Sequence, residues 1–225
     1  MSADIRNWFG KTNSSNVNKD ENEENTDKQR VQNNTVSTTS KITETSKITE
    51  TIQISKMKRL KVYTDGSALA NGQKDCCCGG IGVFFEDNDT RNIHKEIYRK
   101  GITNNQCELL AIYEAIIRIK QTEDISRIHV EFCSDSEYSI KVITKWAPQW
   151  RKNGWKKKGG DIKNLNLIKH IMKEIVDLRY NFKHVKAHKI CKFPKHTEQY
   201  KEWYGNYMAD QFANQSAKNL KKRIH

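Results

Sequence analysis

The sequence predicts an α/β domain: a mixed five-stranded sheet, with three antiparallel strands and then two parallel strands, and helices on both faces. Three short apolar segments follow one another between residues 60 and 99 and are separated by polar turns. Helical and strand patterns then alternate as far as residue 222. This order is typical of a sheet that begins as an antiparallel meander and continues through helical crossovers.

The individual elements follow from the spacing of the apolar residues. Alternating apolar residues or short apolar runs predict strands at 60–65, 81–86, 93–99, 128–132 and 182–187. Apolar residues that recur every three or four positions predict helices at 109–116, 138–145, 165–178 and 209–220. The folded part of the chain is therefore expected to span residues 57–225.

Residues 1–56 have a different composition and are expected to form a disordered tail. They contain the hexamer Ser-Lys-Ile-Thr-Glu-Thr twice in succession, at 40–45 and 46–51, within a stretch that is poor in aromatic residues. Such a segment cannot bury enough apolar surface to offset the entropy lost on ordering. Its eight basic and eight acidic residues cancel, so the whole formal charge of +13 belongs to residues 57–225. A domain this basic is expected to bind a polyanion such as a nucleic acid.

The six cysteines form no Cys-x-x-Cys pair, which favours a reducing compartment. The chain has no apolar run of the length that a membrane span requires, and its N-terminus lacks the apolar core of a signal peptide. We expect an intracellular monomer, in the cytoplasm or the nucleus, that is neither secreted nor bound to a membrane.

Four acidic residues are the strongest candidates for a functional site. Asp65 and Asp135 end the first and fourth strands, which the helical crossover makes candidates for parallel neighbours. Glu108 and Asp210 lie where helices are expected to start, and ligands of α/β sheets gather at such ends. Carboxylates this close repel one another, so a fold that assembles them is expected to bind hard divalent cations. Phosphoryl-transfer chemistry is the first hypothesis.

Each acid also has a purely structural interpretation. Asp65 could belong to an ordinary Asp-Gly turn. Glu108 could close a reciprocal helix cap with Asn105, and Asp135 and Asp210 could be first-turn acids favoured by the helix dipole. The joint placement of all four acids favours the metal site over these separate explanations.

Five short motifs occur in an order that identifies a family. They are Tyr-Thr-Asp-Gly-Ser at 63–67, Thr-Asn-Asn-x-x-Glu-Leu at 103–109, Ser-Asp-Ser-x-Tyr at 134–138, Val-Lys-Ala-His at 185–188 and Gly-Asn-x-x-Ala-Asp at 205–210. Through them, residues 57–222 resemble the cellular type 1 ribonuclease H family. The resemblance implies the ribonuclease H fold and an endonuclease that hydrolyses the RNA strand of RNA–DNA hybrids, leaving 5′-phosphate and 3′-hydroxyl ends.

The resemblance also implies roles for the acids. Asp65, Glu108, Asp135 and Asp210 would hold two Mg²⁺ ions, with Mn²⁺ able to substitute, and Asp65 would bridge the two ions. His188 matches the mobile histidine of the family, which assists proton transfer or product departure.

The resemblance also implies substrate contacts for individual residues. Asn71, Asn104 and Asn105 match positions that contact ribose 2′-hydroxyl groups, although turn and cap chemistry would also explain them. Thr103 and Asn164 match two members of a pocket for a DNA phosphate. The third member, an arginine in the family, is Gly101 here.

A basic protrusion is expected between residues 138 and 160, a segment without acids. Its lysines, among them Lys156, would follow the phosphates of the DNA strand. Trp146, Trp150 and Trp155 would pack against deoxyriboses, or, as the structural alternative, be buried behind a solvated helix face.

Two further segments are distinctive. Residues 2–9 resemble the clamp-binding peptides of replication proteins through Ile5, Trp8 and Phe9, with Ser2 in place of the usual leading glutamine. They suggest a sliding clamp as a partner. Residues 189–204 are expected to form a long loop, where many relatives have only a few residues.

The leading functional hypothesis is a nuclease that removes RNA primers or R-loops. A catalytically weak or inactive hybrid-binding module is the alternative from a different class. A junction resolvase or transposase of the same fold is a third reading, which the asparagines and the tryptophan-rich protrusion disfavour.

Overall fold

A computed structural model describes residues 57–71, 73, 77–186 and 191–224. The predicted tail, the clamp-binding peptide with Ile5, Trp8 and Phe9, and His188 all lie outside these residues. Within the described ranges, none of the helices combines the length and the apolar character that crossing a bilayer requires.

The sheet has five strands in the order β3-β2-β1-β4-β5. The strands are β1 (Lys58–Ala68), β2 (Cys78–Phe84), β3 (Ile93–Tyr98), β4 (Ile128–Ser134) and β5 (Tyr180–His184). β1 pairs with β2, and β2 with β3, in antiparallel fashion, whereas β1 with β4 and β4 with β5 are parallel pairs. The predicted mixed sheet is confirmed, including the parallel pairing of the strands that carry Asp65 and precede Asp135.

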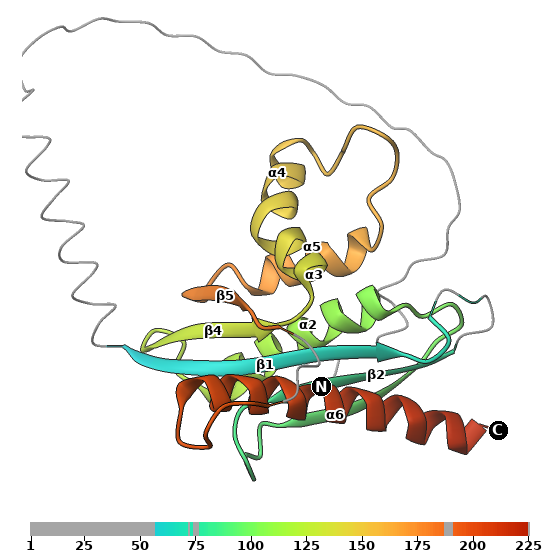
Figure 1. The fold of residues 1–225 in the computed structure, drawn as a ribbon. Helices are drawn as coiled ribbons and strands as arrows, with labels where there is room; N and C mark the ends of the chain where they lie inside the picture. The colour runs from blue at the N-terminus through green and yellow to red at the C-terminus, as the bar shows by residue number, and fades with distance from the viewer. Residues whose placement is uncertain (1–56, 72, 74–76, 187–190, 225) are drawn as a thin grey trace, which may run out of the picture. The chain divides into compact units, whose positions relative to one another are not determined.

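Helices cover both faces of this sheet (Figure 1). They are α2 (Asn104–Thr122), α3 (Glu137–Lys141), the π-helix η2 (Val142–Trp146), α4 (Ala147–Lys152), α5 (Leu165–Glu174) and α6 (Glu198–Ile224). In Figure 1, α6 runs along one face, beneath β1 and β2, while α2 and α5 lie on the opposite face. The larger hydrophobic core fills the space between the sheet and α2.

α2 supplies the centre of this core. Leu109, Ile112, Ile116 and Ile119 recur at helical spacing and are completely buried. They belong to one cluster with Phe132 of β4 and the apolar face of α5. Burying a side chain of this size contributes about 1.5–3 kcal/mol, so α2 contributes strongly to the stability of the sheet.

α6 covers the other face by close backbone approach. A Cβ atom on Gly80 of β2 would lie 2.1 Å from the carbonyl oxygen of Ala213, so only glycine fits there. The sheet-facing side of α6 is correspondingly small, with Ala209, Ala213 and Ala217 completely buried. This contact brings the middle of α6, and Asp210 with it, close to β1.

The start of α2 differs from the cap suggested by Asn105 and Glu108. Thr103 is the N-cap residue: its hydroxyl accepts a hydrogen bond from the Gln106 backbone N–H, and the Gln106 side chain accepts one from the Thr103 N–H. Glu108 therefore lies beyond the cap, and its carboxylate is available for another purpose.

The predicted helix at 138–145 continues to residue 152 through a π turn. Pro148 explains the irregularity, because it has no N–H to donate to the preceding turn. The Ala147 N–H instead bonds to the Val142 carbonyl, five residues earlier. α3, η2 and α4 together form the protrusion predicted from the basic segment.

The last helix begins earlier than predicted. Residues 198–204 were expected in a long loop, yet they form the first turns of α6, with the Thr197 hydroxyl accepting the Tyr200 N–H at 3.2 Å. Tyr200 and Tyr204 stack one helical turn apart, with ring centroids separated by 5.9 Å. Asp210 is consequently in the middle of a helix and is no first-turn acid.

Other boundaries also differ from the prediction. β1 continues to Ala68, so Asp65 and Gly66 lie inside the strand and neither end it nor form a turn. α2 spans Asn104–Thr122 instead of 109–116. α5 ends at Glu174, and the next residues form a turn closed by the hydrogen bond from the Leu178 N–H to the Ile175 carbonyl. β5 therefore starts at Tyr180, two residues before the predicted strand.

Candidate active site

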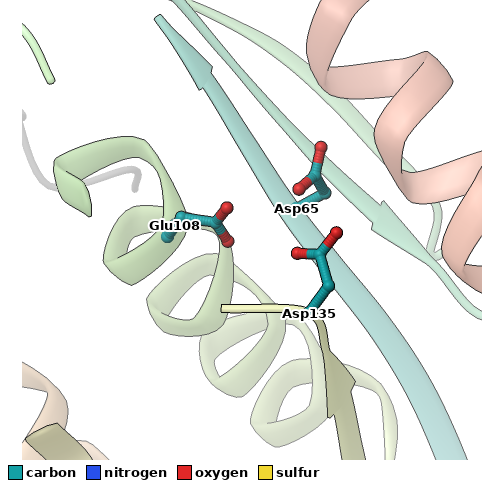
Figure 2. Close-up of side chains that lie close together, drawn as sticks. All are labelled: Asp65, Glu108 and Asp135. Carbon is teal, nitrogen blue, oxygen red and sulfur yellow. The ribbon is translucent and has the colours of Figure 1, made fainter. Parts of the chain in front are cut away.

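Three acidic side chains that are far apart in the sequence lie close together (Figure 2). Asp65 comes from β1, Glu108 from α2, and Asp135 directly follows β4. Each offers a carboxylate oxygen, and the three oxygens lie within 4.8 Å of one another. The parallel register pairs Tyr63 with Cys133, so the two aspartates are placed side by side two residues later. The structure thus brings together three of the four predicted acids.

The glycine that follows Asp65 makes this convergence possible. A Cβ atom on Gly66 would lie 2.1 Å from the backbone nitrogen of Glu108 and 2.2 Å from the carbonyl carbon of Cys107. Any side chain at this position would push α2 away from β1. Gly66 is therefore needed for the close approach of α2 to β1.

Burial and charge make the cluster electrostatically costly without a cation. Asp65 is 7% exposed and Glu108 is 8% exposed. Burial, and then the charges of Asp135 and Asp210, raise the pKa of Asp65 from 3.8 to about 8. Burial, and then the charges of Asp65 and Asp135, raise the pKa of Glu108 well above its ordinary value. The Gly66 backbone N–H lowers both pKa values, but its effect is smaller.

The donor set fits a hard divalent cation. The Glu108 Oε2 atom is buried, and no group in the described part of the chain donates a hydrogen bond to it. A buried carboxylate oxygen without a partner is expensive, and a cation would supply the missing partner. All the available donors are carboxylate oxygens, which suit Mg²⁺ or Mn²⁺.

Asp210 lies near this group but outside it. Its charge contributes to the raised pKa of Asp65, so the two carboxylates are within electrostatic reach. Its own oxygens accept hydrogen bonds from the side-chain amides of Asn214, at 2.8 Å, and Gln211, at 3.3 Å. Because it projects from α6 on the opposite face of the sheet, it reaches the site from another direction than Glu108.

A cavity of about 570 Å³ opens beside the start of α2. Six predicted substrate contacts line it: Asn71, Thr103, Asn105, Asn164, Trp146 and Trp150. Lys157 of the predicted basic protrusion and Tyr138 of the motif at 134–138 also line it, together with Gln106 and Lys163, which the sequence did not single out. The predicted contacts Asn104, Trp155 and Lys156 are not among its lining residues.

Gln106 connects two sides of this cavity. Its backbone N–H and side-chain oxygen complete the α2 cap, and its side-chain NH₂ group donates to the Asn164 Oδ1 atom at 3.1 Å. Asn164 adopts the left-handed conformation, φ 61°, at the start of α5, and its NH₂ group lies 3.4 Å from the Tyr138 hydroxyl. The third position of the capping box is the sequence signal that could have identified Gln106.

Asn71 and Asn104 have the structural roles that turn and cap chemistry would give them. The Asn71 Oδ1 atom accepts from the Asn104 backbone N–H at 3.1 Å, and the Asn104 Oδ1 atom accepts from the Ala68 N–H at 2.7 Å. These bonds tie the end of β1 to the start of α2. Contacts with a ligand would fall to the NH₂ groups of the two side chains.

The three tryptophans of the protrusion divide into two sets. Trp146, 40% exposed, packs against Tyr138 and Trp150, with ring centroids at 6.2 Å and 6.0 Å. Trp155 lines a separate hollow, where the Lys169 ammonium lies 5.4 Å from the ring centroid. Only the first set faces the cavity that contains Asn164.

We predict that Asp65→Asn stabilises the metal-free protein at high pH. The pKa of Asp65 is raised on folding, so the native state retains a proton that the unfolded state loses, and stability falls as the pH rises from about 4 to about 8. In EDTA at pH 8, the variant should be more stable by at least about 1.4 kcal/mol, the free energy of one pKa unit. Urea unfolding at pH 5 and pH 8 measures the difference.

Asp161→Asn, a change at an exposed acid, serves as the control and should leave the wild-type pH dependence intact. If Asp65→Asn is less stable than the wild type at pH 8, burial and the neighbouring acids do not destabilise the Asp65 carboxylate.

Comparison with known proteins agrees with this geometry. The RNase H family model matches residues 56–218. A ribonuclease H of Schizosaccharomyces pombe is 37% identical over 160 residues, which are 71% of this chain and 53% of that protein. A ribonuclease H of Actinobacillus pleuropneumoniae is 36% identical over 136 residues, 59% of this chain and 80% of that protein.

The chain thus spans about half the length of the yeast relative and most of the bacterial one. Among solved structures, LC9-RNase H1, a type 1 RNase H with the type 2 active-site motif, has the same fold, with a TM-score of 0.53 and 24% identity over 72% of this chain and 74% of that one. The family model covers the sheet, α2 and the three acids together, and the chain belongs to the RNase H family.

Proposed function

We propose that this protein is an endonuclease that hydrolyses the RNA strand of RNA–DNA hybrids and leaves 5′-phosphate and 3′-hydroxyl ends. The observation that carries the proposal is the buried cluster of Asp65, Glu108 and Asp135 in a chain of the RNase H family. Removal of primers or R-loops, inside the cytoplasm or the nucleus, is the role that suits such an activity.

The chemistry that we propose uses two metal ions. Asp65, Glu108, Asp135 and Asp210 would hold two Mg²⁺ ions, or Mn²⁺ in their place, and when bound these ions supply charge neutralisation and an activated water. The protein keeps Asp65 and Glu108 away from bulk water, which strengthens every charge interaction at the site. His188 is proposed to move a proton or help the product to leave, and it lies outside the described residues.

The cavity gives the proposed substrate a place beside the acids. Asn105 lines it and precedes Glu108 by one turn of α2, so the cavity begins next to the proposed metal site. The side-chain amides that line the cavity can donate to ribose 2′-hydroxyl groups, which distinguish RNA from DNA. Its aromatic rings and the ammonium groups of Lys157 and Lys163 suit the sugars and phosphates of the paired DNA strand.

We expect magnesium-dependent cutting of an end-labelled RNA–DNA hybrid, but not of single-stranded RNA, double-stranded RNA or duplex DNA. Asp65→Asn should reduce cutting at least about 100-fold, because it removes a carboxylate that would hold the proposed ions. Asp161→Asn should cut like the wild type. Tight hybrid binding without cutting by the wild type would identify a binding module, and cutting of duplex DNA would identify a different nuclease of this fold.

The residues that line the cavity lead to a separate prediction about binding. Trp146→Ala should raise KM for the hybrid about tenfold and change kcat less than twofold, because an exposed ring that contacts sugars contributes about 1–3 kcal/mol to binding and none to the chemistry. Steady-state kinetics on a short hybrid measures both constants. Tyr98→Ala removes an exposed ring that does not line the cavity, so it should leave KM unchanged.

We also propose that Ile5, Trp8 and Phe9 bind a sliding clamp. The support is the sequence pattern alone. Replacing the three residues by alanine should abolish stimulation of hybrid cleavage by the clamp of the same host, while cleavage without the clamp stays the same. Alanine at Ile42 and Ile48, apolar residues of the two hexamers, is the control. Stimulation that survives the triple substitution would exclude this peptide.

A further inference from the structure

α6 carries an amide that joins Asp210 to β1. The Asn214 Nδ2 atom donates to the Asp210 Oδ1 atom at 2.8 Å, and the Asn214 Oδ1 atom accepts from the Ser67 hydroxyl at 2.7 Å. Asn214 follows Asp210 by four residues, so the two side chains lie on one side of the helix. Ser67 belongs to β1 and follows Asp65 by two residues, so it projects from the same face of that strand.

The two hydrogen bonds give the amide a single orientation. A flipped Asn214 side chain would place its carbonyl oxygen against the Asp210 carboxylate, where two acceptors repel each other. The bond to Asp210 is the stronger one, because its acceptor is charged. Among the described residues, the other carboxylate oxygen, Oδ2, accepts only from the exposed side chain of Gln211, at 3.3 Å.

The position of Asp210 gives this arrangement a purpose. Asp65 and Glu108 are buried and are fixed by the packing of β1 and α2, whereas Asp210 is half-exposed and stands apart from the group that they form with Asp135. An aspartate at such a position would normally have several rotamers. A ligand must be held to about 0.5 Å for productive binding, so Asp210 needs a fixed support.

We propose that Asn214 is a positioning residue for the metal site. It ties Oδ1 of Asp210 to the strand that carries Asp65 and leaves Oδ2 as the oxygen offered to the cation. This inference rests on the proposed function, because it assigns Asp210 to the metal site. The competing explanation is structural: Asn214 would only fasten α6 to the sheet.

The experiment compares Asn214→Ala with Asn219→Ala. Asn219 accepts from Gln215 at 3.0 Å, in an exposed amide pair of the same i, i+4 spacing on the same helix. Within the described part of the chain, this pair has no hydrogen bond to β1 or to an acidic residue. For Asn214→Ala we expect kcat for the hybrid to fall about tenfold, the half-saturating Mg²⁺ concentration to rise about fivefold, and KM for the hybrid to stay within twofold. Asn219→Ala should match the wild type in all three.

A second readout needs no substrate. Mn²⁺ should raise the melting temperature of the wild type, and this rise should be at least halved in Asn214→Ala, while the melting temperatures in EDTA agree within about 2 °C. A lower melting temperature in EDTA, together with an unchanged response to Mn²⁺ and Mg²⁺, would overturn the proposal in favour of the structural explanation. Asn214→Asp keeps the shape and the Ser67 contact but loses the donor, so it should be at least as defective as the alanine variant.

Ser67→Ala tests whether the support is transmitted through the amide. Removing the hydroxyl frees Asn214, so the single change should cause part of the loss, and the double variant Ser67→Ala/Asn214→Ala should be no worse than Asn214→Ala alone. If the losses of the two single variants add in the double variant, Ser67 does not act through Asn214. If the wild type fails to cut hybrids, the proposed function falls, while the Mn²⁺ melting shifts still decide the role of Asn214.

Discussion

Repulsion between buried carboxylates is the constraint on which the rest of this structure depends. Asp65 and Glu108 are both buried, and burial, followed by the repulsion from neighbouring acidic charges, raises the pKa of each carboxyl. The stabilisation that offsets this repulsion comes from the apolar side of α2, where Leu109, Ile112, Ile116 and Ile119 are completely buried. A metal site of this kind therefore needs a large core directly beneath it, and the sheet and α2 provide one.

Close backbone contact brings the acids to the site from both faces of the sheet. Gly66 admits the start of α2 to β1, and Gly80 admits α6 to β2. The first contact places Glu108 beside Asp65, and the second brings Asp210 within electrostatic reach. The same small residues thus serve packing and chemistry, because a helix held farther away by a side chain could not deliver its carboxylate.

The start of α2 links recognition to the acids. The Thr103–Gln106 capping box begins the helix, Gln106 also holds Asn164 across the cavity, and Glu108 follows within the next turn. A change that loosens this cap would disturb the cavity and the acidic group together. The protrusion completes the cavity by contributing Tyr138, Trp146 and Trp150, whereas Trp155 belongs to a separate hollow on α5.

The sequence by itself determined the mixed sheet and its parallel centre, because alternation and helical spacing are local patterns, and it indicated that Asp65, Glu108 and Asp135 would come together. It did not determine where α6 begins, because the aromatic-rich segment 200–204 is helical although a loop was predicted there. Nor did it indicate the roles of Gln106 and Asn214. Gln106 meets a residue 58 positions away, and Asn214 meets Ser67 across 147 positions. Contacts at such separations leave no periodic trace in the chain, so only the tertiary structure could decide them.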